Sequence, residues 1–204
     1  MSSSRTPIAI SCAGIALVAL GAAFAIDHDV NDLVRRHRTD EIHAVARLLS
    51  LLGTGAFFVP LLAILFLRGW VLDDRRLLEI ALLGAVALVL AGIASPTLKL
   101  IFSRIRPHDP GAGTFRLFAF ASADSSFPSG HTMAAFALAG VLAAAAGTRG
   151  RIAILGVASL VPLARVAGGR HFLADVVAGA VLGLLLSALA GVVVSAWRRR
   201  RSRE

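Results

Sequence analysis

The sequence predicts an all-α integral membrane protein, a bundle of six transmembrane helices. Of its 204 residues, 57% are hydrophobic and only 16% are charged, a balance far from that of soluble globular domains. Six stretches contain no Asp, Glu, Lys or Arg, and crossing a bilayer takes roughly 20 apolar residues. The period-two alternation of a membrane β-barrel is absent, so helices are the remaining way to satisfy the backbone in lipid.

The uncharged stretches follow one another along the whole chain. They cover residues 8–26, 48–67, 80–98, 132–148, 152–164 and 176–197. The fifth is short and contains Pro162, so it crosses only if residues up to Gly169 continue it. In the sixth, Gly179 and Gly183 form a Gly-x-x-x-Gly pattern, which predicts close packing against another helix. With no repeat or long linker, residues 1–204 form one predicted domain.

The first stretch and the segment after it each have two interpretations. Arg5 precedes the stretch and Ala23-Phe24-Ala25 resembles a cleavage site, but its length exceeds the roughly 7–15 residues of a signal-peptide core. We expect a retained span, and cleavage stays open. Residues 30–47 mix apolar and basic positions, which fits either a helix lying in the membrane interface or a solvated connector. We expect a solvated loop for four polar residues around its start: Asp27, His28, Asp29 and Asp32.

The net charge of +9 would suit a nucleic-acid partner, but the basic residues flank the apolar stretches. No nucleic acid and no obligatory protein partner is therefore expected. If the arginine tail (residues 198–203) is cytoplasmic, both termini are inside, with 11 of the 21 basic residues, five of them in the tail. The ends of stretches three and five then face the exterior.

Two basic residues stand out at the end of the third stretch. Lys99 is the one lysine among 21 basic residues, and Arg106-Pro107 follows seven positions later. Proline disfavours helix in the residue before it, so this helix should end near Ile105. Lys99 and Arg106 would then lie about two turns apart on one face. A pair of snorkelling interfacial residues is the alternative.

The fourth stretch opens with Pro128-Ser129-Gly130-His131. Proline and serine are common helix starters, so an ordinary cap explains part of the pattern. Gly130 and His131 remain unexplained by a cap. Free backbone N–H groups at a helix start bind anions, and a neighbouring histidine exchanges protons with the bound group.

A third cluster joins the last two stretches and contains Arg165, His171 and Asp175. The histidine and aspartate are four residues apart, so the carboxylate can hold one ring nitrogen and leave the other as a nucleophile. A purely structural His–Asp pair is the alternative. In any alternating six-span arrangement the three clusters lie on one membrane face. Their cations and histidines together predict a phosphate site.

The three clusters resemble the three signature motifs of the type-2 phosphatidic acid phosphatase superfamily, which also includes vanadium haloperoxidases. The matching patterns are Lys99 with six residues before Arg106-Pro107, Pro128 to His131, and Arg165 with five residues before His171 and three before Asp175. The resemblance covers about residues 80–197. One position departs from it, because Ala164 stands where the family usually has serine.

The resemblance implies a role for each matched residue. His171 would attack phosphorus and become a phosphohistidine, Asp175 would orient it, and His131 would protonate the leaving group and then activate water. The phosphate oxygens would be bound by Lys99, Arg106, Arg165 and the backbone amides of Ser129 and Gly130. The resemblance implies no metal and no cofactor.

The resemblance also implies a lipid phosphatase in a bacterial inner membrane, and a cytoplasmic arginine tail would make its site face the periplasm or exterior. It would remove a terminal phosphate from a lipid phosphate or diphosphate. Undecaprenyl diphosphate is the substrate that we expect first. Phosphatidylglycerophosphate, phosphatidic acid and a lipid phosphotransferase reaction are the alternatives. A transporter component is disfavoured, because the polar residues lie at the ends of the stretches and no two related halves are visible.

The segment 109–127 is glycine-rich first and aromatic later. It suits a lid in the headgroup layer or, equally, phenylalanines packed on the bundle. Five nearby polar residues have no assigned role: Arg104, His108, Arg116, Asp124 and Arg170.

Overall fold

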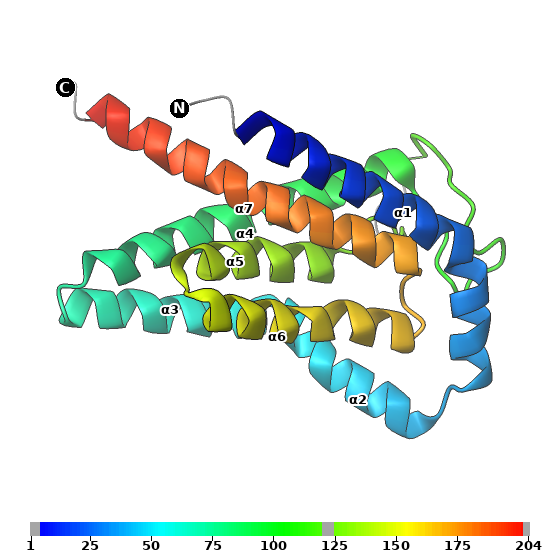
Figure 1. Cartoon of the computed structure of the whole chain (residues 1–204). Helices are drawn as coiled ribbons and strands as arrows, with labels where there is room; N and C mark the ends of the chain where they lie inside the picture. Colours follow the sequence, from blue (N-terminus) through cyan, green and yellow to red (C-terminus); the bar gives the residue numbers. More distant parts are fainter. Residues whose placement is uncertain (1–4, 120–124, 202–204) are drawn as a thin grey trace.

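The computed structural model describes residues 5–119 and 125–201. Its elements are α1 (Arg5–Arg36), α2 (Asp40–Ser50), the 3-10 turn η1 (Leu51–Gly53), α3 (Gly55–Val71), α4 (Arg75–Phe102), α5 (Gly130–Ala145), α6 (Thr148–Ala167) and α7 (Leu173–Arg201) (Figure 1). Within these residues the only β pairing is two isolated bridges in the α4–α5 connection. The predicted all-α class is confirmed.

Four of these helices, α1, α4, α6 and α7, are long and apolar enough to cross a membrane. The α2–η1 segment and α3 pass the same test only together, with a bend of 41° between them, and α5 is shorter at 16 residues. The described residues therefore contain four or five candidate spans, against six predicted. The stretch 48–67 is not one helix, because η1 and the extended residue Thr54 interrupt it.

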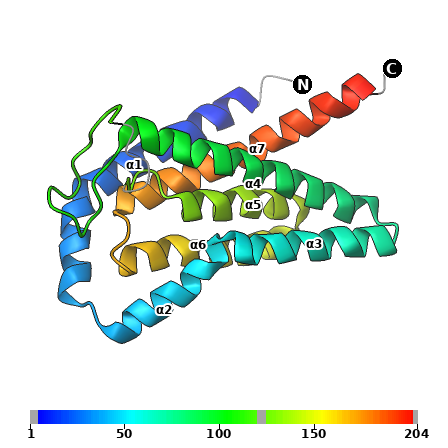
Figure 2. The ribbon, with the colours of Figure 1, turned by 180° about the vertical axis from the view of Figure 1, so that it is seen from behind.

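Helix α5 lies in the interior of the bundle, between α4, α6 and α7 (Figures 1 and 2). Gly179 and Gly183 make its contact with α7 possible. A Cβ atom on Gly179 would lie 2.7 Å from the carbonyl oxygen of Ser129, and one on Gly183 would collide with the carbonyl oxygen of Met133. The predicted close packing at the Gly-x-x-x-Gly pattern is confirmed.

Two predictions about helix ends were wrong. Helix α1 continues to Arg36, so Asp27 lies on a helix rather than in a solvated loop, and its side chain is buried. Helix α4 ends at Phe102, and Ser103 caps it in a left-handed conformation with φ of 39°. Arg106 is consequently not on the helical face that carries Lys99. Helix α6 continues past Ala164 but ends at Ala167, short of Gly169, and its 20 residues from Thr148 form a candidate span.

The connection between α4 and α5 packs part of its aromatic content onto the bundle. The ring of Phe127 lies 5.2 Å from that of Phe102 and 6.0 Å from that of Phe24, and Phe115 joins the same cluster. Packing, rather than a lid, accounts for these two loop residues. Phe118 is exposed. Asp124 lies outside the described residues.

Candidate active site

A strongly basic cavity of about 680 Å³ is lined by residues of α2 and of the end of α6. Its wall includes Arg106 after α4, His131 at the start of α5 and Arg165 in the last turn of α6. The three sequence clusters thus contribute to one cavity. Its other charged or titratable lining residues are His43, Arg47, His108, Asp109 and Arg170.

Lys99, in the last turn of α4, is half-buried near this cavity. Its Nζ donates to the carbonyl oxygen of Ser125 at 3.0 Å, which fixes the end of the long side chain. The ammonium group interacts electrostatically with Arg106 and Arg165. The structure therefore brings the three predicted phosphate-binding cations together, although Lys99 and Arg106 do not share a helix.

His171 lies in the turn between α6 and α7, and its side chain is almost fully buried beside Asp175. Nδ1 is 3.5 Å from Oδ2 of Asp175 and, among the described residues, has no hydrogen-bond partner. Burial lowers the pKa of His171 to about 4, against the opposing effect of Asp175. The imidazole is therefore neutral at physiological pH, the form in which a ring nitrogen can attack.

Asp175 is held by two donors besides its contact with His171. Its Oδ2 accepts from the backbone N–H of Phe172 at 2.8 Å, and its Oδ1 accepts from Nη1 of Arg104 at 2.7 Å. Asp175 is fully buried and Arg104 is 3% exposed. The carboxylate that faces His171 is thus fixed in orientation and compensated in charge.

Arg104 is held in turn by Asp27 of α1. Nη2 of Arg104 donates to Oδ2 of Asp27 at 2.8 Å, and Oδ1 of Asp27 accepts from the N–H of Ala174 at 2.8 Å. The guanidinium also lies 4.1 Å from the ring centroid of Phe172, a cation–π contact. A buried chain Asp27–Arg104–Asp175–His171 therefore connects α1 to the start of α7.

Sequence reasoning missed Asp27 and Arg104, the two members that lie farthest from His171 in this series of contacts. Arg104 had no assigned role, and Asp27 was placed in a solvated loop. One sequence feature pointed to Asp27: its carboxylate directly follows an apolar stretch, where a charge without a partner is costly. No spacing rule, however, connects Asp27 with a residue 77 positions later.

The start of α5 differs from the prediction for Ser129. Its backbone N–H donates to the carbonyl oxygen of Asp175 at 3.0 Å, so this amide is engaged within the protein rather than available to phosphate. Its hydroxyl pairs with that of Thr132. Gly130 lets α5 approach α4 closely, because a Cβ atom there would lie 2.5 Å from Oγ of Ser95.

Hydrogen bonds join the first and third clusters at the edge of the basic cavity. Nη1 of Arg106 donates to the carbonyl oxygen of Arg170 at 3.3 Å, and the N–H of Arg170 donates to the carbonyl oxygen of Arg165 at 3.0 Å. Nε of Arg165 is buried and has no hydrogen-bond partner among the described residues. It is thus suited to donate to an anion.

His131 also borders an apolar groove of about 580 Å³ between α3 and α4. Val59, Leu88 and Val89 line this groove, and Thr54 and His131 line both it and the basic cavity. The groove and the basic cavity therefore meet at His131.

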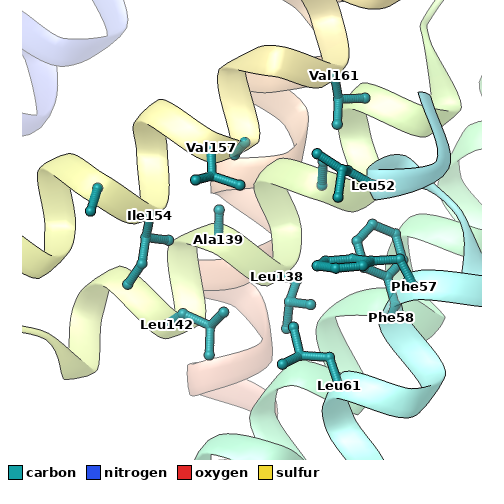
Figure 3. Close-up of a pocket in the computed structure, with 13 residues that line it drawn as sticks. Leu52, Phe57, Phe58, Leu61, Leu138, Ala139, Leu142, Ile154, Val157 and Val161 are labelled. Atoms are coloured by element: carbon teal, nitrogen blue, oxygen red, sulfur yellow. The ribbon is translucent and has the colours of Figure 1, made fainter. Parts of the chain in front are cut away.

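A separate apolar cavity of about 270 Å³ lies between α3, α5 and α6 (Figure 3). It is lined by carbon side chains such as Phe57, Leu138 and Val157, so it contains no group that can act on phosphate. Val161 lines it about one turn of α6 before Ala164, which lines the basic cavity. The two cavities are therefore neighbours.

Among residues 5–119 and 125–201, no group of three or more His, Cys, Asp or Glu is placed to hold a metal ion. Of the polar residues left unassigned, His108 and Arg170 line the basic cavity and His108 lies 3.6 Å from Asp109. Arg116 is exposed.

Comparison with known proteins places these features in a family. The family model described as the PAP2 superfamily matches residues 80–201, which include all three clusters. A protein named lipid A 1-phosphatase in Rhizobium etli is 30% identical over 172 residues, covering 76% of this chain and 73% of the relative. One of that name in Porphyromonas gingivalis is 31% identical over 157 residues, but this chain spans only 33% of it.

Two solved structures are similar. The crystal structure of Aquifex aeolicus LpxE has a TM-score of 0.66 at 25% identity, covering 81% of this chain and 94% of that one. That of a PAP2-type phosphatidylglycerolphosphate phosphatase from Bacillus subtilis has a TM-score of 0.70 at 24% identity, covering 92% and 96%. The second likeness concerns the fold alone.

Proposed function

The chain belongs to the PAP2 superfamily, and from this membership and the geometry of its site we propose that it is an integral membrane lipid phosphatase. One observation carries the proposal. A buried, neutral His171 backed by Asp175 interacts electrostatically with Arg106, Arg165 and His131, which line the basic cavity. Cations that outnumber the single lining carboxylate, Asp109, suit an incoming phosphate dianion beside this nucleophile.

Nε2 of His171 attacks phosphorus while the bond from phosphorus to the lipid oxygen breaks. His131 gives a proton to that leaving oxygen. His131 then takes a proton from water, which attacks phosphorus while the bond from phosphorus to Nε2 breaks, releasing inorganic phosphate and free His171. Asp175 holds the imidazole in position throughout.

Charge stabilisation comes from Lys99, Arg106 and Arg165, which surround the non-bridging oxygens, and from the amide of Gly130. Positioned charges supply most of the catalysis in phosphoryl transfer. Because these three cations neutralise the phosphoryl oxygens, we propose that turnover needs no metal ion.

The position of His131 supports a lipid substrate, because the basic cavity meets the apolar groove between α3 and α4 at this residue. A phosphate in the cavity and a hydrocarbon chain in the groove place the scissile bond near this histidine. The chain can remain in the bilayer during the reaction.

We further propose six crossings, with α2 and α3 forming one bent crossing and α5 the short one. At about 1.5 Å per residue α5 is about 24 Å long, less than the roughly 30 Å hydrocarbon core. Other helices surround it, so its ends need not meet lipid. With the arginine tail cytoplasmic, the site faces the periplasm of a bacterial inner membrane.

The physiological substrate is then a lipid phosphate or diphosphate exposed on the outer face. Undecaprenyl diphosphate, phosphatidylglycerophosphate and phosphatidic acid all fit this description, and the names of the relatives add lipid A. If a second lipid rather than water reaches the phosphohistidine, the same site acts as a phosphotransferase.

The test is a phosphate-release assay on purified protein with these lipids and a soluble phosphate ester, with and without excess chelator. We expect the kcat/KM for one lipid to exceed those for the other lipids and for the soluble ester. Turnover should be unaffected by chelator. Equal hydrolysis of the soluble ester would contradict a lipid phosphatase. Loss of activity with chelator, restored by magnesium, would contradict the metal-free mechanism.

A further inference from the structure

Helix α2 contributes to the basic cavity a set of side chains that none of the three motifs contains. His43, Ala46, Arg47 and Ser50 all line the cavity, and their spacing of three and four residues puts them on one face of the helix. Ala46 anchors this face against the end of α6, because its Cβ lies 3.5 Å from where a Cβ on Gly168 would be.

The apolar residues of α2 are not turned toward the protein, as those of a solvated amphipathic helix would be. Arg47 is exposed and borders the cavity, while Val45 and Leu48, on the opposite side together with the exposed Glu41, are 56% and 66% exposed. A solvated connector would turn its charge outward and its apolar residues inward. In the bent α2–α3 crossing the apolar side of α2 can face lipid, and Arg47 on the inner side then serves the cavity.

The cavity carries more positive charge than one phosphate requires. Lys99, Arg106 and Arg165 already serve the reacting phosphoryl group, yet Arg47 and Arg170 line the same space. The lining contains one carboxylate, Asp109, and that group lies 3.6 Å from His108. Within the described part of the chain, Arg47 has no acidic partner.

A second feature supports an anion on the α2 side. Nε of Arg38 donates to Nε2 of His43 at 2.8 Å, which holds another guanidinium beside the cavity wall. The cavity volume of about 680 Å³ falls within the roughly 300–1,000 Å³ of pockets that hold a whole small molecule. It therefore has room for a headgroup larger than one phosphate.

We infer that Arg47, supported by His43 and Arg38, forms a second anion subsite that binds a second phosphate of the lipid headgroup. This inference rests on the proposed function, and it narrows the substrate class to lipids with two phosphate groups. The first phosphate lies at His171 and is cleaved. The second, joined to it in a diphosphate or carried elsewhere on the headgroup, lies at Arg47.

The experiment compares three lipids with the same hydrocarbon chain: a monophosphate, a diphosphate, and one with two separate phosphates. Arg47→Ala should lower kcat/KM about tenfold or more for at least one of the two-phosphate lipids and less than about twofold for the monophosphate. The two-phosphate lipid whose kcat/KM falls shows whether the second phosphate is joined to the first or carried elsewhere on the headgroup. Arg47→Lys should restore part of the loss.

Arg35→Ala is the matched control, because it removes an exposed arginine at the nearby end of α1 that does not line the cavity. We expect it to leave all three values within about twofold of wild type. An equal loss on the monophosphate, no loss on either two-phosphate lipid, or the same pattern in the control would overturn the inference.

A binding measurement separates failure of the subsite from failure of the proposed function. The His171→Ala protein is titrated with inorganic pyrophosphate and with inorganic phosphate, with and without Arg47→Ala. The second substitution should weaken pyrophosphate binding about tenfold and phosphate binding less than about twofold. Equal effects would overturn the subsite, whereas absent turnover by wild type on every lipid would overturn the proposed function.

Discussion

At the scale of single residues, the neutral state of His171 follows from burial rather than from its partner. Asp175 favours the charged imidazolium, but removal from water disfavours it more strongly, and the net result is a lowered pKa. Arg104 reinforces this outcome, because it already compensates the carboxylate of Asp175. The aspartate can therefore position the histidine without protonating it.

This balance predicts the titration of His171. The neutral form should persist as pH falls through 6.5, where an exposed histidine becomes charged, and be lost only near pH 4. NMR of the protein with isotopically labelled histidine, assigned with a His171→Gln variant, measures this directly. Protonation of His171 above pH 6 would contradict the account.

At the scale of elements, α1 is more than a membrane anchor. Asp27 holds Arg104 and caps the N–H of Ala174, so α1 helps to fix the start of α7 that carries Asp175. Breaking a buried ion pair leaves an uncompensated charge, which typically costs about 3–5 kcal/mol.

Asp27→Asn should therefore lower both stability and turnover. We expect a lower thermal midpoint in detergent and a fall in kcat larger than any rise in KM, because Asp175 loses its fixed position while the phosphate cations remain. Asp29→Asn, two residues along the same helix and exposed, is the control. A variant with normal kcat would show that α1 has no part in positioning Asp175.

The contact between α5 and α7 gives a second prediction at this scale. Gly183→Ala places a methyl group against the carbonyl of Met133 in the packed interior, and such overpacking costs about 1–3 kcal/mol. Gly191→Ala, on the same helix with nothing within 4 Å, should be neutral or slightly stabilising. Thermal unfolding of the two variants in one detergent makes the comparison. Similar midpoints would argue against tight α5–α7 packing.

The sequence located these elements better than it located their ends. Hydropathy places apolar helices because lipid excludes charge, but α1 runs ten residues beyond its apolar stretch since Asp27 finds a partner in Arg104. The interruption at Thr54 and the early end of α4 are set by local backbone geometry, which composition does not encode.

At the scale of the whole molecule, the convergence of the three clusters on one face followed from alternating topology alone. Topology alone does not predict which residues the packed helices bring into contact. Two features depend on contacts between elements distant in sequence: the hydrogen bond from the Ser129 amide to Asp175, and the contribution of α2 to the cavity. No spacing rule predicts such contacts. The motifs were therefore predictable, and the residues that support them were not.

In the proposed mechanism, phosphate passes through a covalent bond to His171. The most direct measurement is to mix the enzyme with a lipid labelled in its terminal phosphate, quench rapidly in alkaline denaturant, and locate the label by peptide mass spectrometry. We predict base-stable, acid-labile label on the peptide containing His171, and none in His171→Ala protein of normal fold. Continued phosphate release by that variant, or label on another residue, would contradict the account.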